Sequence, residues 1–226
     1  MDRRKFSTRL LLASRSPRRA DLLRAAGLEF EVCAADVDES VRRGESPAEY
    51  VQRLASAKSA AAAALKGSTA SPTAALKGCA ATAASGSPSS VGQAFSPASE
   101  MVILGADTSV VVDEVILGKP VDDEDAAAML RRLSGRGHEV ITGLSIRVGS
   151  RELRHVERTA VYFAALDEED IAWYVQSGEG RDKAGAYAIQ GLASRLIPRI
   201  EGSYANVVGL PIAAVCALIR KLNTGV

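Results

Sequence analysis

Short apolar runs alternate with amphipathic stretches along the chain, and this pattern predicts both strands and helices. The runs expected to form strands are residues 9–13, 30–35, 101–106, 109–112, 115–117, 138–148, 153–165 and 195–200. The stretches expected to form helices are residues 16–26, a segment beginning at the capping box 46–49, and residues 122–133, 167–176 and 212–222. Because crossovers and hairpins both occur, we expect an α/β fold with a mixed sheet.

Residues 66–99 interrupt this pattern. The composition around them falls to Ala, Ser, Gly, Thr and Pro, and the string Ala-Ala-Leu-Lys-Gly occurs at 63–67 and again at 74–78. Such residues provide few large apolar side chains to offset the entropy of ordering the chain. We therefore interpret about 66–99 as a low-complexity insertion in a single domain that covers residues 1–226. Since a long loop adds little closure cost, its removal is expected to cost little activity.

Composition and charge narrow the class of protein. The chain is 47% hydrophobic and 24% charged with a formal net charge of +1, as in ordinary globular proteins. This balance argues against a nucleic-acid arm at the arginine-rich N-terminus, and no nucleic acid is expected as a partner. The apolar run that follows Arg3-Arg4 is too short for a signal peptide or a membrane span. A mitochondrial-type presequence is the alternative, and the early start of the first predicted strand argues against it.

The cysteines indicate the compartment. The chain has three of them, Cys33, Cys79 and Cys216, widely spaced and without CxxC or Cys/His pairs. Neither a disulfide framework nor a zinc site is suggested, so a reduced, cytoplasmic location is expected.

An anion-binding motif follows the first predicted strand. Ser14, Ser16, Arg18 and Arg19 lie at a strand-to-helix turn, where backbone N–H groups and guanidiniums favour a negative charge. A capped surface helix with solvated arginines is the alternative interpretation.

Acidic residues give a second candidate site. Asp107 follows an apolar strand, a common position for a metal ligand or general base, although a turn-forming Asp is the alternative. The pair Asp38-Glu39 could share a divalent cation with Asp107, and a solvated acidic turn is the alternative interpretation. Gly118-Lys119-Pro120 is not a P-loop, because it lacks the preceding glycine pattern and the hydroxyl residue.

Taken together, these motifs resemble the Maf family of nucleotide pyrophosphatases along nearly the whole chain. The resemblance is carried by Leu12-Ala13-Ser14-Arg15-Ser16-Pro17-Arg18-Arg19, by Leu104-Gly105-Ala106-Asp107-Thr108 with Leu117-Gly118-Lys119-Pro120, and by Asp182-Lys183-Ala184-Gly185-Ala186-Tyr187-Ala188-Ile189-Gln190-Gly191. It implies a fold similar to inosine triphosphate pyrophosphatases, with two lobes around a cleft, and a homodimer. Residues 66–99 depart from the family pattern by their length.

The resemblance also implies a set of functional residues. Ser14, Arg18, Arg19, Glu39, Lys58, Asp107, Lys119 and Gln190 match positions that the family uses. Glu39 and Asp107 would hold Mg²⁺ or Mn²⁺, Asp107 would orient the attacking water, and the basic residues would neutralise a nucleoside triphosphate. The Arg18-Arg19 pair and the string Ile189-Gln190-Gly191 resemble the branch of the family that acts on dTTP and UTP. A non-catalytic, nucleotide-binding regulator of cell division is the alternative function.

Overall fold

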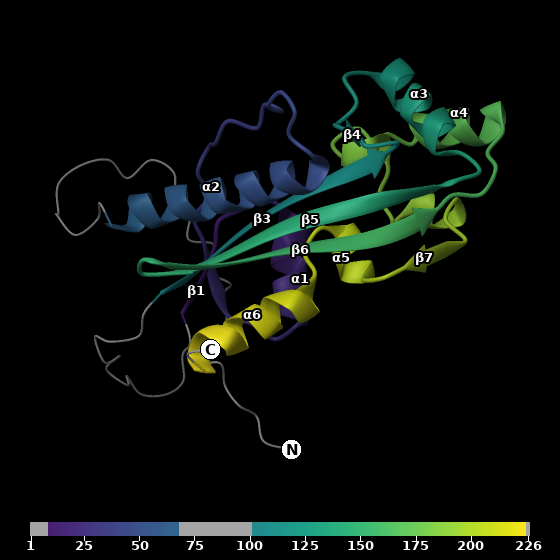
Figure 1. The fold of residues 1–226 in the computed structure, drawn as a ribbon. Helices are drawn as coiled ribbons and strands as arrows, with labels where there is room; N and C mark the ends of the chain where they lie inside the picture. Colours follow the sequence, from purple (N-terminus) through teal and green to yellow (C-terminus); the bar gives the residue numbers. More distant parts are fainter. Residues whose placement is uncertain (1–8, 68–100, 225–226) are drawn as a thin grey trace.

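The computed structural model describes residues 9–67 and 101–224, whose arrangement is drawn in Figure 1. In chain order the elements are β1 (Leu10–Leu12), α1 (Pro17–Ala25), β2 (Phe30–Val32), α2 (Pro47–Gly67), β3 (Val102–Val112), β4 (Val115–Leu117), α3 (Asp123–Leu133), β5 (Gly137–Val148), β6 (Arg151–Tyr162), α4 (Glu168–Gln176), the 3₁₀ helices η2 (Ala184–Ala186) and η3 (Leu192–Arg195), β7 (Arg199–Glu201), α5 (Tyr204–Val208) and α6 (Ile212–Thr224).

The strands form one mixed sheet. Its order is β2-β1-β3-β5-β6-β7, and β4 pairs with β3 outside this path. β1 runs parallel to both β2 and β3, whereas β3, β5 and β6 are successively antiparallel. Parallel neighbours require crossover connections, which α1 and α2 supply, while β5 and β6 form a long hairpin. The α/β fold with a mixed sheet is therefore confirmed.

Local signals start the helices and turns where the sequence predicts them. In the capping box before α2, the Ser46 N–H donates to Glu49 Oε2 at 2.9 Å. Asp122 and Asp167 each accept from the backbone N–H three residues later, which satisfies an otherwise orphaned donor at the start of α3 and of α4. Asp113 has a positive φ of 50°, as the turn between β3 and β4 requires.

Several sequence-based boundaries were wrong. β2 ends at Val32 rather than at residue 35, and β6 covers Arg151–Tyr162 rather than residues 153–165. β3 is one continuous strand rather than two, and Asp107 lies within it rather than after it. Its polar side chains find partners in the interior, so they do not end the strand. The final strand is Arg199–Glu201 instead of residues 195–200, because the chain before it coils into η3. η2 and α5 are too short to produce a detectable helical periodicity.

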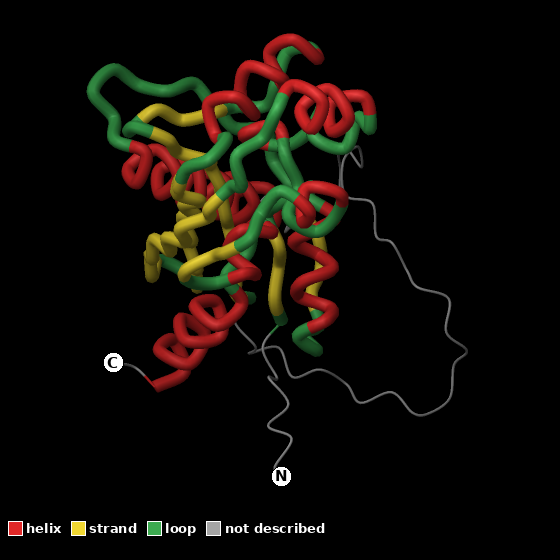
Figure 2. The backbone as a smooth tube through the Cα atoms, turned by 90° about the vertical axis from the view of Figure 1, so that its right-hand side faces the viewer, coloured by secondary structure: helices red, strands yellow, loops and turns green. Residues whose placement is uncertain are grey.

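Two clusters of buried side chains lie at opposite ends of the long strands. The β1 lobe packs α1 and α6 against β1 and the first half of β3, with a core that includes Leu12, Leu23, Leu104, Leu144, Leu210 and Leu218. The β4 lobe packs α3 and α4 against the far ends of β3, β5 and β6, with a core that includes Leu117, Leu130, Leu133, Val161, Tyr174 and Leu196. Figure 2 shows the strands between helices on either side.

The predicted insertion at about 66–99 begins at the last two residues of α2, and the rest of it lies outside the described residues. Within 9–67 and 101–224, none of the helices has the length and apolar character that a bilayer span needs.

Candidate active site

A gap along one edge of β3 opens the sheet between the two lobes. β1 pairs with β3 only at residues 102–104, and β4 pairs with it only at residues 110–112. Residues 105–109 therefore have no strand beside them on that edge. A cavity of about 630 Å³ lies against this gap, walled by the β1–α1 turn, α2, β3, the end of β4 and the segment 182–190.

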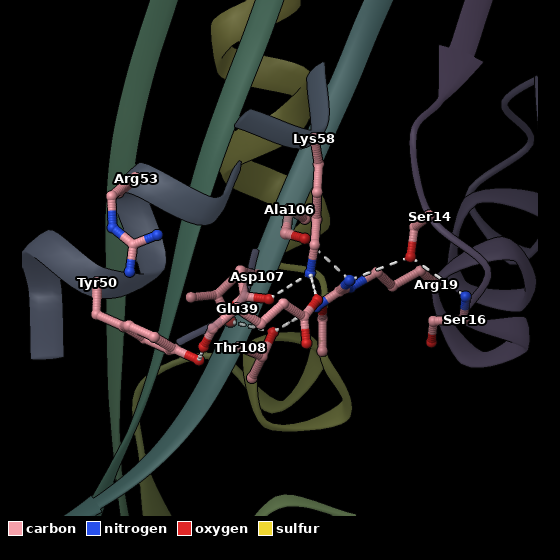
Figure 3. Close-up of polar contacts among 12 residues, drawn as sticks. Ser14, Ser16, Arg19, Glu39, Tyr50, Arg53, Lys58, Ala106, Asp107 and Thr108 are labelled. Carbon is pink, nitrogen blue, oxygen red and sulfur yellow. Dashed lines mark hydrogen bonds and ion pairs between the residues drawn. The ribbon is translucent and has the colours of Figure 1, made fainter. Parts of the chain in front are cut away.

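This cavity collects almost the whole set of sequence-predicted residues. Its wall includes Ser16, Arg18, Arg19, Glu39, Lys58, Asp107, Lys119 and Gln190. Ser14 is the exception, because its buried side chain lies behind Arg19 and bonds to it instead of lining the cavity. Figure 3 shows Ser14, Arg19, Lys58 and Asp107 converging from separate elements.

Lys58 of α2 connects two carboxylates across the cavity. Its Nζ lies 2.7 Å from Asp107 Oδ1 and 2.7 Å from Glu39 Oε1. The Lys58 and Asp107 side chains are only 13% and 12% exposed, whereas the Glu39 side chain is 59% exposed. Asp107 is therefore a buried carboxylate with a fixed cationic partner, and Glu39 is the more exposed acid of the two.

Close packing of α2 on the sheet makes this ion pair possible. A Cβ added at Gly105 would lie 2.2 Å from the carbonyl oxygen of Ala55, and one at Gly143 would lie 2.4 Å from that of Val51. Both glycines thus let the backbone of α2 rest directly on β3 and β5. This close approach carries Lys58 to Asp107, which follows Gly105 on β3 by two residues and points to the same face.

Burial dominates the electrostatics of Asp107. It raises the pKa of the carboxyl above the usual value of 3.8, and the nearby charges of Lys58 and Arg19 oppose this shift without cancelling it. A carboxylate with a raised pKa accepts a proton more readily than a solvated one, as a general base requires.

The loop that carries Glu39 is held by α2. Tyr50 donates its phenolic O–H to the Glu39 carbonyl at 2.8 Å. Arg53 binds Glu45 through two hydrogen bonds of 2.5 and 2.8 Å and also donates to the Ser40 carbonyl at 2.9 Å. The Glu39 carboxylate consequently faces Lys58 from an anchored loop rather than from a solvated turn.

Arg19 is committed to contacts inside the protein. Its guanidinium donates to the carbonyls of Gly209 at 2.8 Å and Ala106 at 3.0 Å, and to the hydroxyls of Ser14 at 3.1 Å and Thr108 at 3.0 Å. The Ala106 carbonyl belongs to the open edge of β3, so Arg19 replaces the missing strand there. Burial lowers the pKa of Arg19. Because its donors are already used, Arg19 fits the role of a fixed positive charge in the cavity wall better than that of a flexible phosphate ligand.

Four other predicted residues have polar groups that are free to bind a ligand: Ser16, Arg18, Lys119 and Gln190. Ser16 is the N-cap residue of α1, but its hydroxyl makes no capping hydrogen bond. Within the described part of the chain, the side chains of Arg18, Lys119 and Gln190 form no hydrogen bond or ion pair, and all three line the cavity. They can bind a ligand without breaking an existing contact.

The cavity also contains residues that the sequence reasoning did not select. Thr108 bonds to Arg19 and to Thr142, and Lys183 forms an ion pair with Asp182. Both lie inside the motifs quoted above, so the motifs themselves could have identified them. With Arg15 included, six basic residues and three acidic residues line the cavity, which favours an anionic ligand.

Glu39 and Asp107 are the carboxylates that could hold a divalent cation. They meet at the same Lys58 Nζ, so both can reach one point in the cavity. Among the described residues no group of three His, Cys, Asp or Glu side chains could hold a metal by itself. Mg²⁺ commonly binds through one or two carboxylates with waters and substrate phosphates completing the shell, and the two acids fit that mode.

Comparisons with known proteins cover nearly the whole chain. Residues 9–222 match the family model described as "Maf-like protein". The chain is 46% identical over 214 residues to a dTTP/UTP pyrophosphatase of Symbiobacterium thermophilum, covering 95% of this chain and 94% of the relative. It is 41% identical over 215 residues to a dTTP/UTP pyrophosphatase of Hahella chejuensis, covering 95% and 92%, and 45% identical over 221 residues to one of Methylobacillus flagellatus, covering 97% and 95%.

Proposed function

The chain belongs to the family of Maf-like proteins, and we propose that it hydrolyses dTTP and UTP to the nucleoside monophosphate and pyrophosphate. The observation that carries the proposal is the buried Asp107 carboxylate, held 2.7 Å from Lys58 in a cavity with an excess of basic residues. A triphosphate supplies the negative charge that such a wall favours, and Asp107 supplies a base beside it.

The proposed reaction is attack of water on the α-phosphorus. Asp107 accepts a proton from that water as the new P–O bond forms, and the bond from the α-phosphorus to the bridging oxygen breaks to release pyrophosphate. No covalent intermediate with the protein is needed. The raised pKa of Asp107 suits this role, since its carboxylate binds the proton more firmly than a solvated acid would.

The basic residues of the cavity bind the phosphates and stabilise the charge that develops in the reaction. Arg18 and Lys119, whose side chains are available, bind the phosphate oxygens directly, while Lys58 stays close enough to hold Asp107 and to contact the charge developing at phosphorus. Arg19 contributes a fixed positive charge in the cavity wall, and its bonds to Ser14 and Gly209 hold the β1–α1 turn in place.

A divalent cation, Mg²⁺ or Mn²⁺, completes the proposal. Glu39 and Asp107 would hold it, and it would neutralise phosphate oxygens when bound. Lys58 would then share the two carboxylates with the cation.

We assign base recognition to Gln190, which lies exposed on the cavity wall. Its amide offers one donor and one acceptor, which match O4 and N3–H of uracil or thymine. Cytosine presents the reversed pattern, so the enzyme would discriminate only where the amide is held in one orientation.

A substrate panel tests the function. Purified protein would be given dTTP, UTP, CTP, ATP and GTP with Mg²⁺ or Mn²⁺, and release of pyrophosphate and monophosphate would be measured together. We expect pyrophosphate from dTTP and UTP, and none after chelation of the metal. Binding of UTP without any product would instead favour the nucleotide-binding regulator, and release of inorganic phosphate alone would exclude the proposed bond cleavage.

Two further properties belong to the proposal. A homodimer is proposed from the resemblance to the family, and sedimentation of the full chain would measure it. A cytoplasmic location is proposed from the spacing of the three cysteines, and fractionation of the source cells would check it.

A further inference from the structure

Gln190 occupies the middle of a tight turn. The Gly191 N–H donates to the Ala188 carbonyl at 3.3 Å, which places Ile189 and Gln190 at the two central positions. The Gln190 side chain itself makes no hydrogen bond with the described residues, so its position depends on how the turn is held.

Both ends of this turn bond to one pair of side chains. Before the turn, the Ala188 N–H donates to the Tyr174 hydroxyl at 3.1 Å. After it, the backbone N–H groups of Leu192 and Ala193 donate to the Glu179 carboxylate at 2.9 and 3.3 Å. Tyr174 in turn donates its O–H to Glu179 Oε2 at 2.7 Å, so the two anchors are joined.

The pair is rigidly supported. Tyr174 lies on α4, is 1% exposed and belongs to the core of the β4 lobe. A Cβ added at Gly191 would lie 1.8 Å from Glu179 Oε1, which shows how closely the chain passes over the carboxylate. Burial first, and then the bond to Glu179, raise the pKa of Tyr174, so its phenol stays protonated and keeps donating.

Neither member of the pair lines the cavity. Since Tyr174 and Glu179 lie outside the cavity wall, we expect their effect on selectivity to pass through the turn. Because the Gln190 amide has no hydrogen-bond partner of its own among the described residues, the position of its backbone sets the distance and direction from which the amide approaches a base.

We propose that Tyr174 and Glu179 are positioning residues that set base selectivity by holding the Gln190 turn at both ends. This inference rests on the proposed function. It extends that function by naming the groups outside the cavity that make the pyrimidine contact selective.

Tyr174→Phe is the direct test, because it removes the hydroxyl and keeps the buried ring. The ratio of kcat/KM for UTP to that for CTP should fall about threefold to tenfold, which is the range expected for loss of one or two hydrogen bonds that orient a recognition group. Competition by inorganic tripolyphosphate, which has no base, should be unchanged. Tyr162→Phe is the matched control, since it breaks a Tyr–Glu hydrogen bond of 3.0 Å to Glu201 away from the cavity.

Glu179→Gln provides a second variant if Tyr174→Phe folds poorly. Its amide can accept at one atom only, so it cannot satisfy Tyr174 and both backbone N–H groups, and the same fall in the ratio is expected. In a Gln190→Ala background, Tyr174→Phe should change the ratio little further.

The outcomes distinguish failure of the positioning role from failure of the proposed pyrophosphatase activity. A selective wild type whose UTP to CTP ratio survives both Tyr174→Phe and Glu179→Gln would overturn the positioning role and leave the pyrophosphatase intact. Independent, additive losses with Gln190→Ala would also overturn it. If the wild type released no pyrophosphate from any nucleotide, the proposed function itself would fail.

Discussion

Replacing Asp107 by Asn isolates its chemical role from its structural one. In the structure, Lys58 Nζ lies 2.7 Å from Asp107 Oδ1. The Asn amide has nearly the shape of the carboxylate, and its oxygen can still accept a hydrogen bond from Lys58 Nζ. It cannot accept a proton from water or bind a cation as strongly. Loss of a general base typically costs about 10² to 10⁴ in rate, or about 3 to 5 kcal/mol of transition-state stabilisation.

The same change should not destabilise the fold. Because burial outweighs the attraction of Lys58 and Arg19 and raises the pKa of Asp107, the folded protein binds a proton at this site more tightly than the unfolded chain does. Ionised Asp107 therefore lowers stability at neutral pH, and this penalty disappears as pH falls through the folded pKa towards 3.8. Asp107→Asn removes the penalty, while Glu39 remains to pair with Lys58.

Two measurements check this reasoning. Pyrophosphate release from UTP gives kcat and kcat/KM, and thermal unfolding at neutral and mildly acidic pH gives the stability difference. We expect lost turnover with an equal or higher Tm at neutral pH, and a smaller Tm difference in acid. Asp123→Asn is the matched control, because that exposed carboxylate pairs with Arg181 outside the cavity. A folded Asp107→Asn enzyme with near-normal turnover would refute the assigned role.

Four further changes test the structure around the site. Gly105→Ala should displace α2, lowering the free energy of unfolding by about 1–3 kcal/mol and kcat by at least about tenfold. Urea unfolding and turnover measure the two effects. Gly67→Ala, with open space around the added methyl group, should change neither quantity. Gln190→Ala should reduce the UTP to CTP ratio of kcat/KM by about 1–3 kcal/mol, and an unchanged ratio would remove it from base recognition. Arg53→Ala releases the Glu39 loop, so half-activation should need several-fold more Mg²⁺ in a titration. Deleting residues 68–98 should leave turnover and Tm nearly unchanged, and loss of either would contradict the reading of that stretch as an insertion.

Much of the site could be predicted because its residues lie in short motifs at the ends of strongly patterned elements. The turn after β1 brings Ser16 and Arg18 to the cavity, and the end of β4 brings Lys119. These placements depend on local signals, such as proline at the first position of α1. The sequence is less informative about Tyr174 and Glu179, since neither touches the cavity and each acts through backbone atoms of another segment.

By itself, the sequence determined the type of each long element, the caps that start them and the motifs that gather basic and acidic groups. These properties follow from side-chain periodicity and from hydrogen bonds within a few residues. Only the tertiary structure decided that Lys58 meets Asp107, 49 residues along the chain, because that contact depends on α2 lying directly on Gly105. It also decided that the Arg19 guanidinium is used for hydrogen bonds within the protein, because the carbonyls of Ala106 and Gly209 reach it only when β3 and the C-terminal region pack beside α1.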